Sequence, residues 1–248
     1  MITPVDRPLP SPVWAEAALP TAPSLGRRLL AEFLGTGLLA VVVIGSGIAA
    51  AQLSPGDIGL QLLENSTASA FGLAVLILMF GPISGAHFNP IVSLADWLGG
   101  RRRGTGLGTR ELGAYAAAQT AGAMCGAVLS NAMFDRSAWQ LSTQHRVTGG
   151  HLIGEFVAAA GLIAIGFAMT RHGRVAAAAA VATYLGSAIW FTSSGSFANP
   201  ALTLGRMLSD SFTGIAPASA PAFIAAQLVG GLAGLSVMTL LYRPATAR

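Results

Sequence analysis

Two Asn-Pro pairs, Asn89-Pro90 and Asn199-Pro200, constrain the fold of this chain more than any other feature. Each pair follows an apolar segment and a turn that contains glycine, and each precedes a short apolar run. Asn is a good helix N-cap, and Pro suits the first helical position because the N–H that it lacks would be unpaired there. Each pair therefore predicts a loop, a cap and a helix start. The helices predicted at 91–98 and 201–208 are too short to cross a bilayer, which takes about 20 residues.

The composition indicates a membrane protein. Only 10% of the 248 residues are charged and 53% are hydrophobic, whereas a soluble domain has about 25% charged residues. The net charge of +4 comes from arginines in loops and at segment ends, so it indicates orientation in a lipid bilayer rather than nucleic-acid binding. The sequence has one cysteine and no nucleophile–base set, phosphate loop or metal-spaced cluster. We therefore expect no enzymatic activity, no cofactor and no metal.

Six apolar segments are long enough to span the bilayer. With the two short helices they predict an all-α membrane protein with six transmembrane helices and two re-entrant half-helices. Residues 1–26 contain many prolines and are expected to form a cytoplasmic tail without stable helix. Residues 27–242 are expected to form one domain. The predicted spans are 27–51, 65–80, 111–133, 151–170, 175–192 and 219–242.

The two halves of the chain repeat one pattern, which is the strongest sign of its organisation. A glutamate, an Asn-Pro pair and a glutamine recur in the same order: Glu32, Asn89 and Gln119, then Glu155, Asn199 and Gln227. Each half, about 27–133 and about 151–242, contains three spans, so the two halves lie in opposite orientations. This inverted 3+3 repeat predicts a site near the midplane, where the half-helices meet.

The arginines predict the orientation. With the N-terminus in the cytoplasm, eleven of the fourteen arginines lie inside, and the other three are Arg136, Arg146 and Arg206. Positive charge accumulates on the cytoplasmic side of membrane proteins. We therefore expect a multi-pass protein of the cell (inner) membrane with both termini in the cytoplasm.

Together these elements resemble the aquaporin, or major intrinsic protein, family over about residues 27–242. The most specific pieces are Ser84-Gly85-Ala86-His87-Phe88-Asn89-Pro90 and Phe197-Ala198-Asn199-Pro200-Ala201, with the paired Glu-Phe and Ala-Gln elements beside them. The resemblance implies a passive channel in the lipid bilayer for water and small neutral solutes. It also implies a homotetramer with one pore per subunit.

The motifs Asn89-Pro90-Ile91 and Asn199-Pro200-Ala201 are expected to line the pore. In lipid, irregular backbone is tolerated only inside protein or beside a water-filled cavity, so the loops before both asparagines predict a line of carbonyls facing such a cavity. The two helix N-termini meet with their positive ends together, which opposes cations. Asn89 and Asn199 would orient the permeant. The alternative is that they only cap helices, and the two roles are compatible. Ile91, where the family usually has Ala, adds bulk beside the constriction.

Glu32 and Glu155 lie inside apolar spans, where a bare charge is costly, so each needs a partner or a proton. One interpretation is a proton relay. The other is that each carboxylate accepts hydrogen bonds from the re-entrant loop of its own half, and the family resemblance favours this one. Gln119 and Gln227 are expected to brace the loops in a similar way. His87 could be a pH gate, but a structural role in its loop is the favoured interpretation.

The main departure from the family follows Asn199-Pro200-Ala201, where the usual Arg is replaced by Leu202. The other filter positions align with Ser69, Ser187 and Ser196, and Arg206 is not expected to substitute for the missing Arg. Three serines and a leucine predict a wide, uncharged filter whose selectivity depends on its diameter and lining donors.

Three functions remain open. The sequence resembles a bacterial subgroup that accompanies arsenic-detoxification genes, which implies a passive channel for arsenous acid, methylated arsenicals or glycerol-like solutes. The second possibility is an ordinary water or glycerol channel with a changed filter. The third is a proton-coupled transporter that uses Glu32 and Glu155.

Overall fold

The computed structural model describes residues 23–101 and 104–242. These residues form eight α-helices and no strand, as the sequence predicts. Six of the helices are long and apolar enough to span a membrane, and α3 and α7 are the two short ones. Nearly all of the predicted tail, 1–26, lies outside the described residues. The helices are α1 (Leu25–Leu53), α2 (Ile58–Ser84), α3 (Pro90–Arg101), α4 (Thr109–Met133), α5 (Gly149–Met169), α6 (Arg174–Phe191), α7 (Pro200–Arg206) and α8 (Ala220–Leu241).

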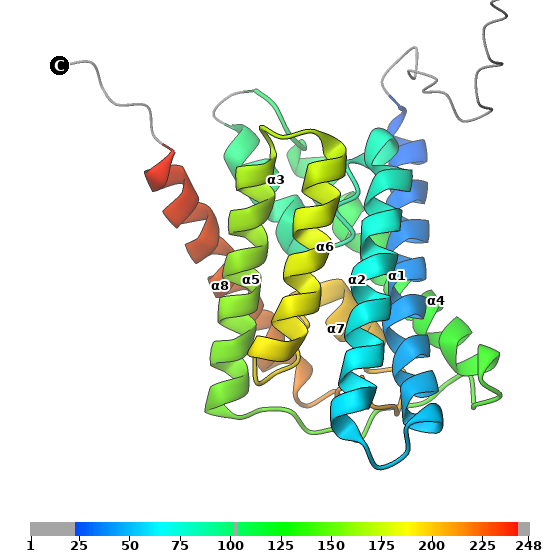
Figure 1. The fold of residues 1–248 in the computed structure, drawn as a ribbon. Coiled ribbons are helices and arrows are strands. Elements are labelled where there is room, and N and C mark those ends of the chain that lie inside the picture. Colours follow the sequence, from blue (N-terminus) through cyan, green and yellow to red (C-terminus); the bar gives the residue numbers. More distant parts are fainter. Residues whose placement is uncertain (1–22, 102–103, 243–248) are drawn as a thin grey trace, which may run out of the picture.

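The helices pack as two related sets. In the first half α1 lies against α2 and α4, and in the second half α5 lies against α6 and α8. The sets join where α2 meets α6 and where α7 meets α4. Figure 1 shows the start of α1 and the end of α8 on the same side of the bundle, with α3 in that half and α7 in the opposite half. The two short helices therefore enter the bundle from opposite sides.

Glycines let the paired helices approach closely, and they do so at equivalent places. A Cβ atom at Gly122 in α4 would overlap the carbonyl of Phe33 in α1. A Cβ atom at Gly230 in α8 would overlap the carbonyl of Phe156 in α5. Small residues at such contacts are typical of membrane helices, which gain stability from close packing.

Helix α2 is longer than its predicted span of 65–80. It begins at Ile58 because the Asp57 side chain accepts a hydrogen bond of 2.9 Å from the N–H of Leu60, which is an N-cap. It also continues past Pro82 and ends at Gly85, whose φ of +89° is left-handed. Glycine adopts this conformation without steric cost, so it suits the end of a helix. The polar segment before residue 65 is therefore helical.

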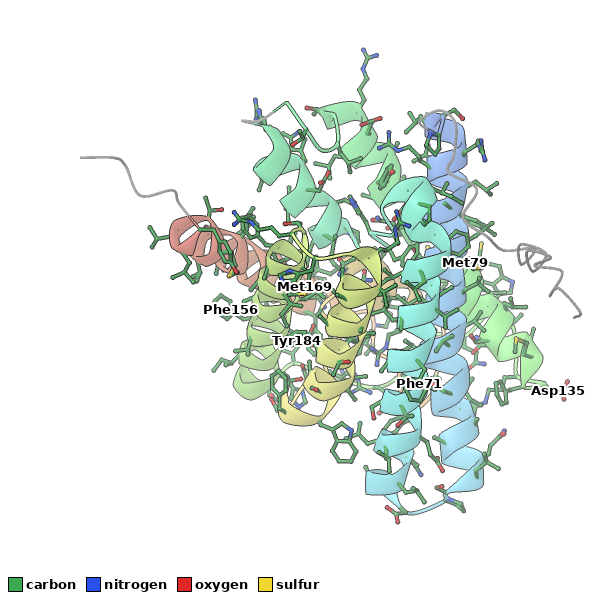
Figure 2. The ribbon with its side chains drawn as sticks, turned by 45° about the horizontal axis from the view of Figure 1, so that its top comes forward. Phe71, Met79, Asp135, Phe156, Met169 and Tyr184 are labelled. Carbon is green, nitrogen blue, oxygen red and sulfur yellow. The ribbon has the colours of Figure 1, made fainter. Side chains whose placement is uncertain are left out.

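Large apolar side chains cover the outer surface of the bundle. Phe71 on α2 is 70% exposed and Phe156 on α5 is 37% exposed, and Figure 2 shows both on the outside. Tyr184 lies between α5 and α6, where its hydroxyl donates to the carbonyls of Val157 and Ala158 at 3.2 Å. An apolar exterior with buried polar groups suits a protein surrounded by lipid.

Candidate functional site

The two re-entrant loops have the same unusual backbone. Ala86 and Phe88 have φ of 51° and 50°, and Ser196 and Ala198 have φ of 47° and 45°. These residues stand three positions and one position before Asn89 and Asn199. A left-handed conformation at a residue other than glycine costs about 1–3 kcal/mol and persists only where the surroundings enforce it. Each loop therefore needs firm support from the rest of the bundle.

Glu32 supports the first loop. It is fully buried in α1 and accepts hydrogen bonds from the N–H groups of His87 (3.0 Å) and Phe88 (2.7 Å). The Ser84 hydroxyl donates to the same carboxylate at 2.6 Å, and the Gln119 amide donates to it at 2.7 Å. Four donors around one carboxylate hold the first loop against α1.

Glu155 supports the second loop in the same way. It is fully buried in α5, and its two oxygens each accept a hydrogen bond of 2.9 Å, from the N–H groups of Phe197 and Ala198. The Gln227 amide donates to it at 2.6 Å. The structure therefore places each glutamate against the loop of its own half, and each glutamine against that glutamate.

Two hydroxyl residues that the sequence analysis did not single out complete these clusters. Ser93 in α3 accepts a hydrogen bond of 2.9 Å from the Gln119 amide, and its hydroxyl lies 3.1 Å from Nδ1 of His87. Thr203 in α7 accepts one of 3.0 Å from the Gln227 amide. Each hydroxyl stands four residues after its asparagine, and this shared spacing is the signal by which the sequence could have revealed them.

The asparagines cap their helices and also join the two halves. Oδ1 of Asn89 accepts from the N–H of Ile91 at 2.9 Å, and its amide donates to the carbonyl of Ala198 at 2.8 Å. Oδ1 of Asn199 accepts from the N–H groups of Ala201 and Leu202 at 3.0 and 3.2 Å. Its amide donates to the carbonyl of Phe88 at 2.8 Å. Each amide has a second N–H, and both asparagines line a cavity.

This central cavity has a volume of about 350 Å³ and is lined by both asparagines, by residues 85–89 and by Leu202. It extends past His87 and Asp96 to Thr170, beside the α5–α6 turn, and its walls on α2 and α6 are apolar. Such a lining combines a few polar groups with apolar walls, which is typical of small-molecule sites. Ile91 does not line it. Ile91 is 2% exposed and packs in the apolar cluster of α5, where its methyl group leaves no room for a side chain at Gly231.

A second cavity of about 330 Å³ lies beside Arg206 and Arg146, and we call it the arginine cavity. Its lining comes from α2, α6 and the loops that flank α5 and α7, and it includes Asn65, Ile189 and Ser194. Arg146 lies in the loop between α4 and α5, where burial lowers the pKa of its guanidinium. Arginine nevertheless keeps its charge in proteins.

Three of the four predicted filter residues are buried: one lies in α2, one in the second loop and one in α7. Ser69 is 0% exposed, Ser196 is 4% exposed and Leu202 is 5% exposed. The hydroxyls of Ser69 and Ser196 have no hydrogen-bond partner in the described protein. Ser69 shares a helix face with Leu73, which lines the central cavity, and with Asn65, which lines the arginine cavity. We refer to Ser69, Ser196 and Leu202 together as the predicted constriction.

The fourth predicted filter residue, Ser187, differs from the other three in its burial. It is exposed, and its hydroxyl donates to the carbonyl of Thr183, one turn back, at 2.9 Å. The residues of α6 that line the cavities are Ala177, Val181 and Leu185 in the central cavity and Ile189 in the arginine cavity. They recur at every fourth position, so they share the face of α6 that points inward.

Comparisons with known proteins agree with this geometry. The chain matches the profile of the family described as "Major intrinsic protein" over residues 20–193 and 173–248. It is 44% identical over 221 residues to aquaglyceroporin AqpS of Rhizobium meliloti (strain 1021), which covers 89% of this chain and 92% of that protein. It is 43% identical to the glycerol uptake facilitator protein of Pseudomonas aeruginosa over 112 residues, 45% of this chain and 37% of that one. The solved aquaglyceroporin from Plasmodium falciparum has a similar fold, with a TM-score of 0.63 at 21% identity over 88% of this chain and 96% of that chain.

Proposed function

The chain belongs to the major intrinsic protein family, whose members are membrane channels and not enzymes, and we propose that it is a passive channel for small neutral solutes. Glycerol-like polyols, arsenous acid and methylated arsenicals are the foremost solutes. Glycerol appears in the name of the Pseudomonas relative and aquaglyceroporin in that of the Rhizobium relative, so a solute pore is favoured over a pore for water alone. Arsenous acid is a neutral trihydroxy molecule near neutral pH and is shaped much like a small polyol.

One observation carries the proposal: none of the four predicted filter residues, Ser69, Ser187, Ser196 and Leu202, has a charged side chain. Leu202 stands where the family usually has Arg, and it lines the central cavity. Like Ser69 and Ser196, it is buried. The unpartnered hydroxyls of both serines could pair with hydroxyl groups of a passing solute. An uncharged passage with a few donors and acceptors suits a neutral molecule that carries several hydroxyls.

The hydrogen bonds of the two glutamates favour a channel over a proton-coupled transporter. Both carboxylates accept from backbone N–H groups and from a glutamine amide, so they brace the re-entrant loops. A proton relay needs a carboxylate that takes up and releases a proton. Neither Glu32 nor Glu155 lines the central cavity or the arginine cavity.

We also propose a homotetramer in the inner membrane, with both termini in the cytoplasm. The start of α1 and the end of α8 lie on the same side (Figure 1), which suits an even number of spans. With this orientation the central cavity opens to the cytoplasm and the arginine cavity opens to the outside.

Stopped-flow light scattering on proteoliposomes tests the proposal. Glycerol, arsenous acid and water are measured separately, with protein-free liposomes as the control and with and without an imposed pH gradient. We expect solute flux that rises linearly with the concentration gradient and does not change with the pH gradient. Flux that saturates and follows the pH gradient would contradict the channel, and flux of water alone would support the ordinary water channel.

A further inference from the structure

The arginine cavity contains more positive charge than a pathway for neutral solutes requires. Two guanidinium groups, those of Arg146 and Arg206, line it, and no acidic residue is among the described residues that do so. The two arginines come from different parts of the chain, Arg146 from the loop before α5 and Arg206 from the last position of α7. The fold therefore brings them together at one cavity.

Arg206 is held firmly. It is 6% exposed, its guanidinium carbon lies 3.3 Å from the centre of the Phe197 ring, and its Nε donates to the carbonyl of Thr213. These contacts fix the plane of the guanidinium, and stacking on an aromatic ring suits arginine particularly well. Its two Nη atoms have no hydrogen-bond partner in the described protein, so their N–H groups remain available in the cavity.

The guanidinium of Arg146 is also held by backbone carbonyls and lies near the same ring. Its Nε donates to the carbonyl of Gly214 at 2.6 Å and its Nη2 donates to the carbonyl of Phe212 at 2.8 Å. Its guanidinium carbon lies 5.5 Å from the centre of the same Phe197 ring. The remaining nitrogen, Nη1, has no hydrogen-bond partner in the described protein. Two ordered cations with unused donors thus share one aromatic ring and one cavity.

No carboxylate neutralises the pair directly. The ion pair found among residues 23–101 and 104–242 is Arg28 with Glu111, so neither cavity arginine has a carboxylate oxygen within 4 Å. Glu155 is the acidic group that acts on both from a distance, but its oxygens accept from Phe197, Ala198 and Gln227. Like charges that are held together and partly desolvated attract a counter-ion.

From this geometry we propose that the arginine cavity is a binding site for a small oxyanion, held between Arg146 and Arg206. Its oxygens accept hydrogen bonds from the unused Nη groups, and charge-assisted bonds of this kind are about twice as strong as neutral ones. The cavity is lined by Asn65, one helical turn before Ser69, and by Gly195, which precedes Ser196, so the anion would bind close to the predicted filter residues. This site goes beyond the proposed conduction of neutral solutes and does not depend on it.

Equilibrium dialysis of the purified full-length channel tests the site, with radiolabelled inorganic phosphate as the probe in a chloride-free buffer of low ionic strength. We expect saturable binding by the wild type. Each variant loses charge-assisted hydrogen bonds to the probe, so Arg146→Gln and Arg206→Gln should each weaken binding by about tenfold or more. Arg136→Gln is the matched control, because Arg136 lies in the same loop as Arg146, donates to the carbonyl of Asp210 and does not line the cavity.

A thermal measurement keeps the test valid if Arg206→Gln does not fold. A ligand that binds only the folded state stabilises it, so phosphate should raise the unfolding temperature of the wild type and of Arg136→Gln. It should have little effect on Arg146→Gln, whose altered residue lies in a loop. The proposal would be overturned if the wild type showed no saturable binding, or if Arg146→Gln bound phosphate as tightly as Arg136→Gln. A channel that passed no solute could still bind phosphate, so failure of the proposed function is a separate result.

Discussion

The side-chain amide of Asn89 donates a 2.8 Å hydrogen bond to the carbonyl of Ala198, which lies 109 residues further along the chain. The side-chain amide of Asn199 likewise donates a hydrogen bond to the carbonyl of Phe88. Each asparagine therefore ties its own half-helix to the loop of the opposite half. Because these loops contain left-handed residues, the crossed hydrogen bonds and the two buried glutamates together keep the middle of the bundle in one conformation.

The first prediction concerns the support given by Glu155. In Glu155→Gln one oxygen becomes an amide group, which cannot accept, so an N–H of Phe197 or Ala198 is left unpaired. A buried donor without a partner costs about 1–3 kcal/mol, and we expect the free energy of unfolding in detergent to fall by about that amount. Glu64→Gln is the control, because Glu64 accepts from Ser54 near the α1–α2 turn and supports no re-entrant loop. Equal stability of the two variants would count against the bracing role.

The second prediction concerns the unpartnered hydroxyl of Ser69. Ser69→Ala removes an oxygen that has no protein partner and places a better helix former in α2. We therefore expect the free energy of unfolding to stay equal or to rise by about 0.5 kcal/mol, while glycerol flux in proteoliposomes falls. A marked loss of stability would mean that the hydroxyl has a structural partner. Unchanged flux would remove Ser69 from the pathway.

The third prediction separates the two faces of α6. Ile189 is 7% exposed and lines the arginine cavity, whereas Ser187 is exposed outside both cavities. We expect Ile189→Phe to reduce glycerol flux several-fold because the added ring narrows the pathway. Ser187→Phe, two residues away, should leave the flux near that of the wild type. If light scattering showed that Ser187→Phe reduces the flux and Ile189→Phe does not, Ser187 would be the filter residue, as predicted from the sequence.

The fourth prediction concerns the contact between α1 and α4. A Cβ at Gly122 would overlap the carbonyl of Phe33, while a Cβ at Gly113 in the same helix would have open space around it. Forcing extra volume into a packed contact costs about 1–3 kcal/mol, so Gly122→Ala should lower the free energy of unfolding. Gly113→Ala should raise it by about 0.5–1 kcal/mol. Denaturant unfolding of both variants checks the pair, and equal effects would contradict close helix packing.

Much of the fold could be predicted because its signals are local. The Asn-Pro pairs mark both half-helix starts, and six apolar segments recur as helices α1, α2, α4, α5, α6 and α8. The prediction failed at the start of α2, where a polar segment is helical because Asp57 caps it. Polar composition alone did not distinguish this exposed turn of helix from a loop.

The site was harder to predict because it depends on which way each helix faces. Helix α6 is apolar nearly all round, so its sequence does not show that Ile189 faces inward while Ser187 faces outward. Ile91 stands two positions after Asn89, which lines the central cavity. Its side chain nevertheless packs toward Gly231 of α8 and does not line that cavity. Arg206 and Arg146 are 60 residues apart in the chain and line one cavity because Arg146 bonds to the loop that follows α7, and no local pattern encodes such a contact.

The central claim, that solute passes an uncharged constriction at Leu202, is tested most directly by solute flux through Leu202→Arg proteoliposomes. Leu202→Met is the matched control, because it keeps an uncharged side chain of similar volume. We predict fast glycerol and arsenous acid flux in the wild type and in Leu202→Met, and loss of both fluxes in Leu202→Arg. Solute flux that continues unchanged in Leu202→Arg would contradict the account and would place selectivity elsewhere in the pore.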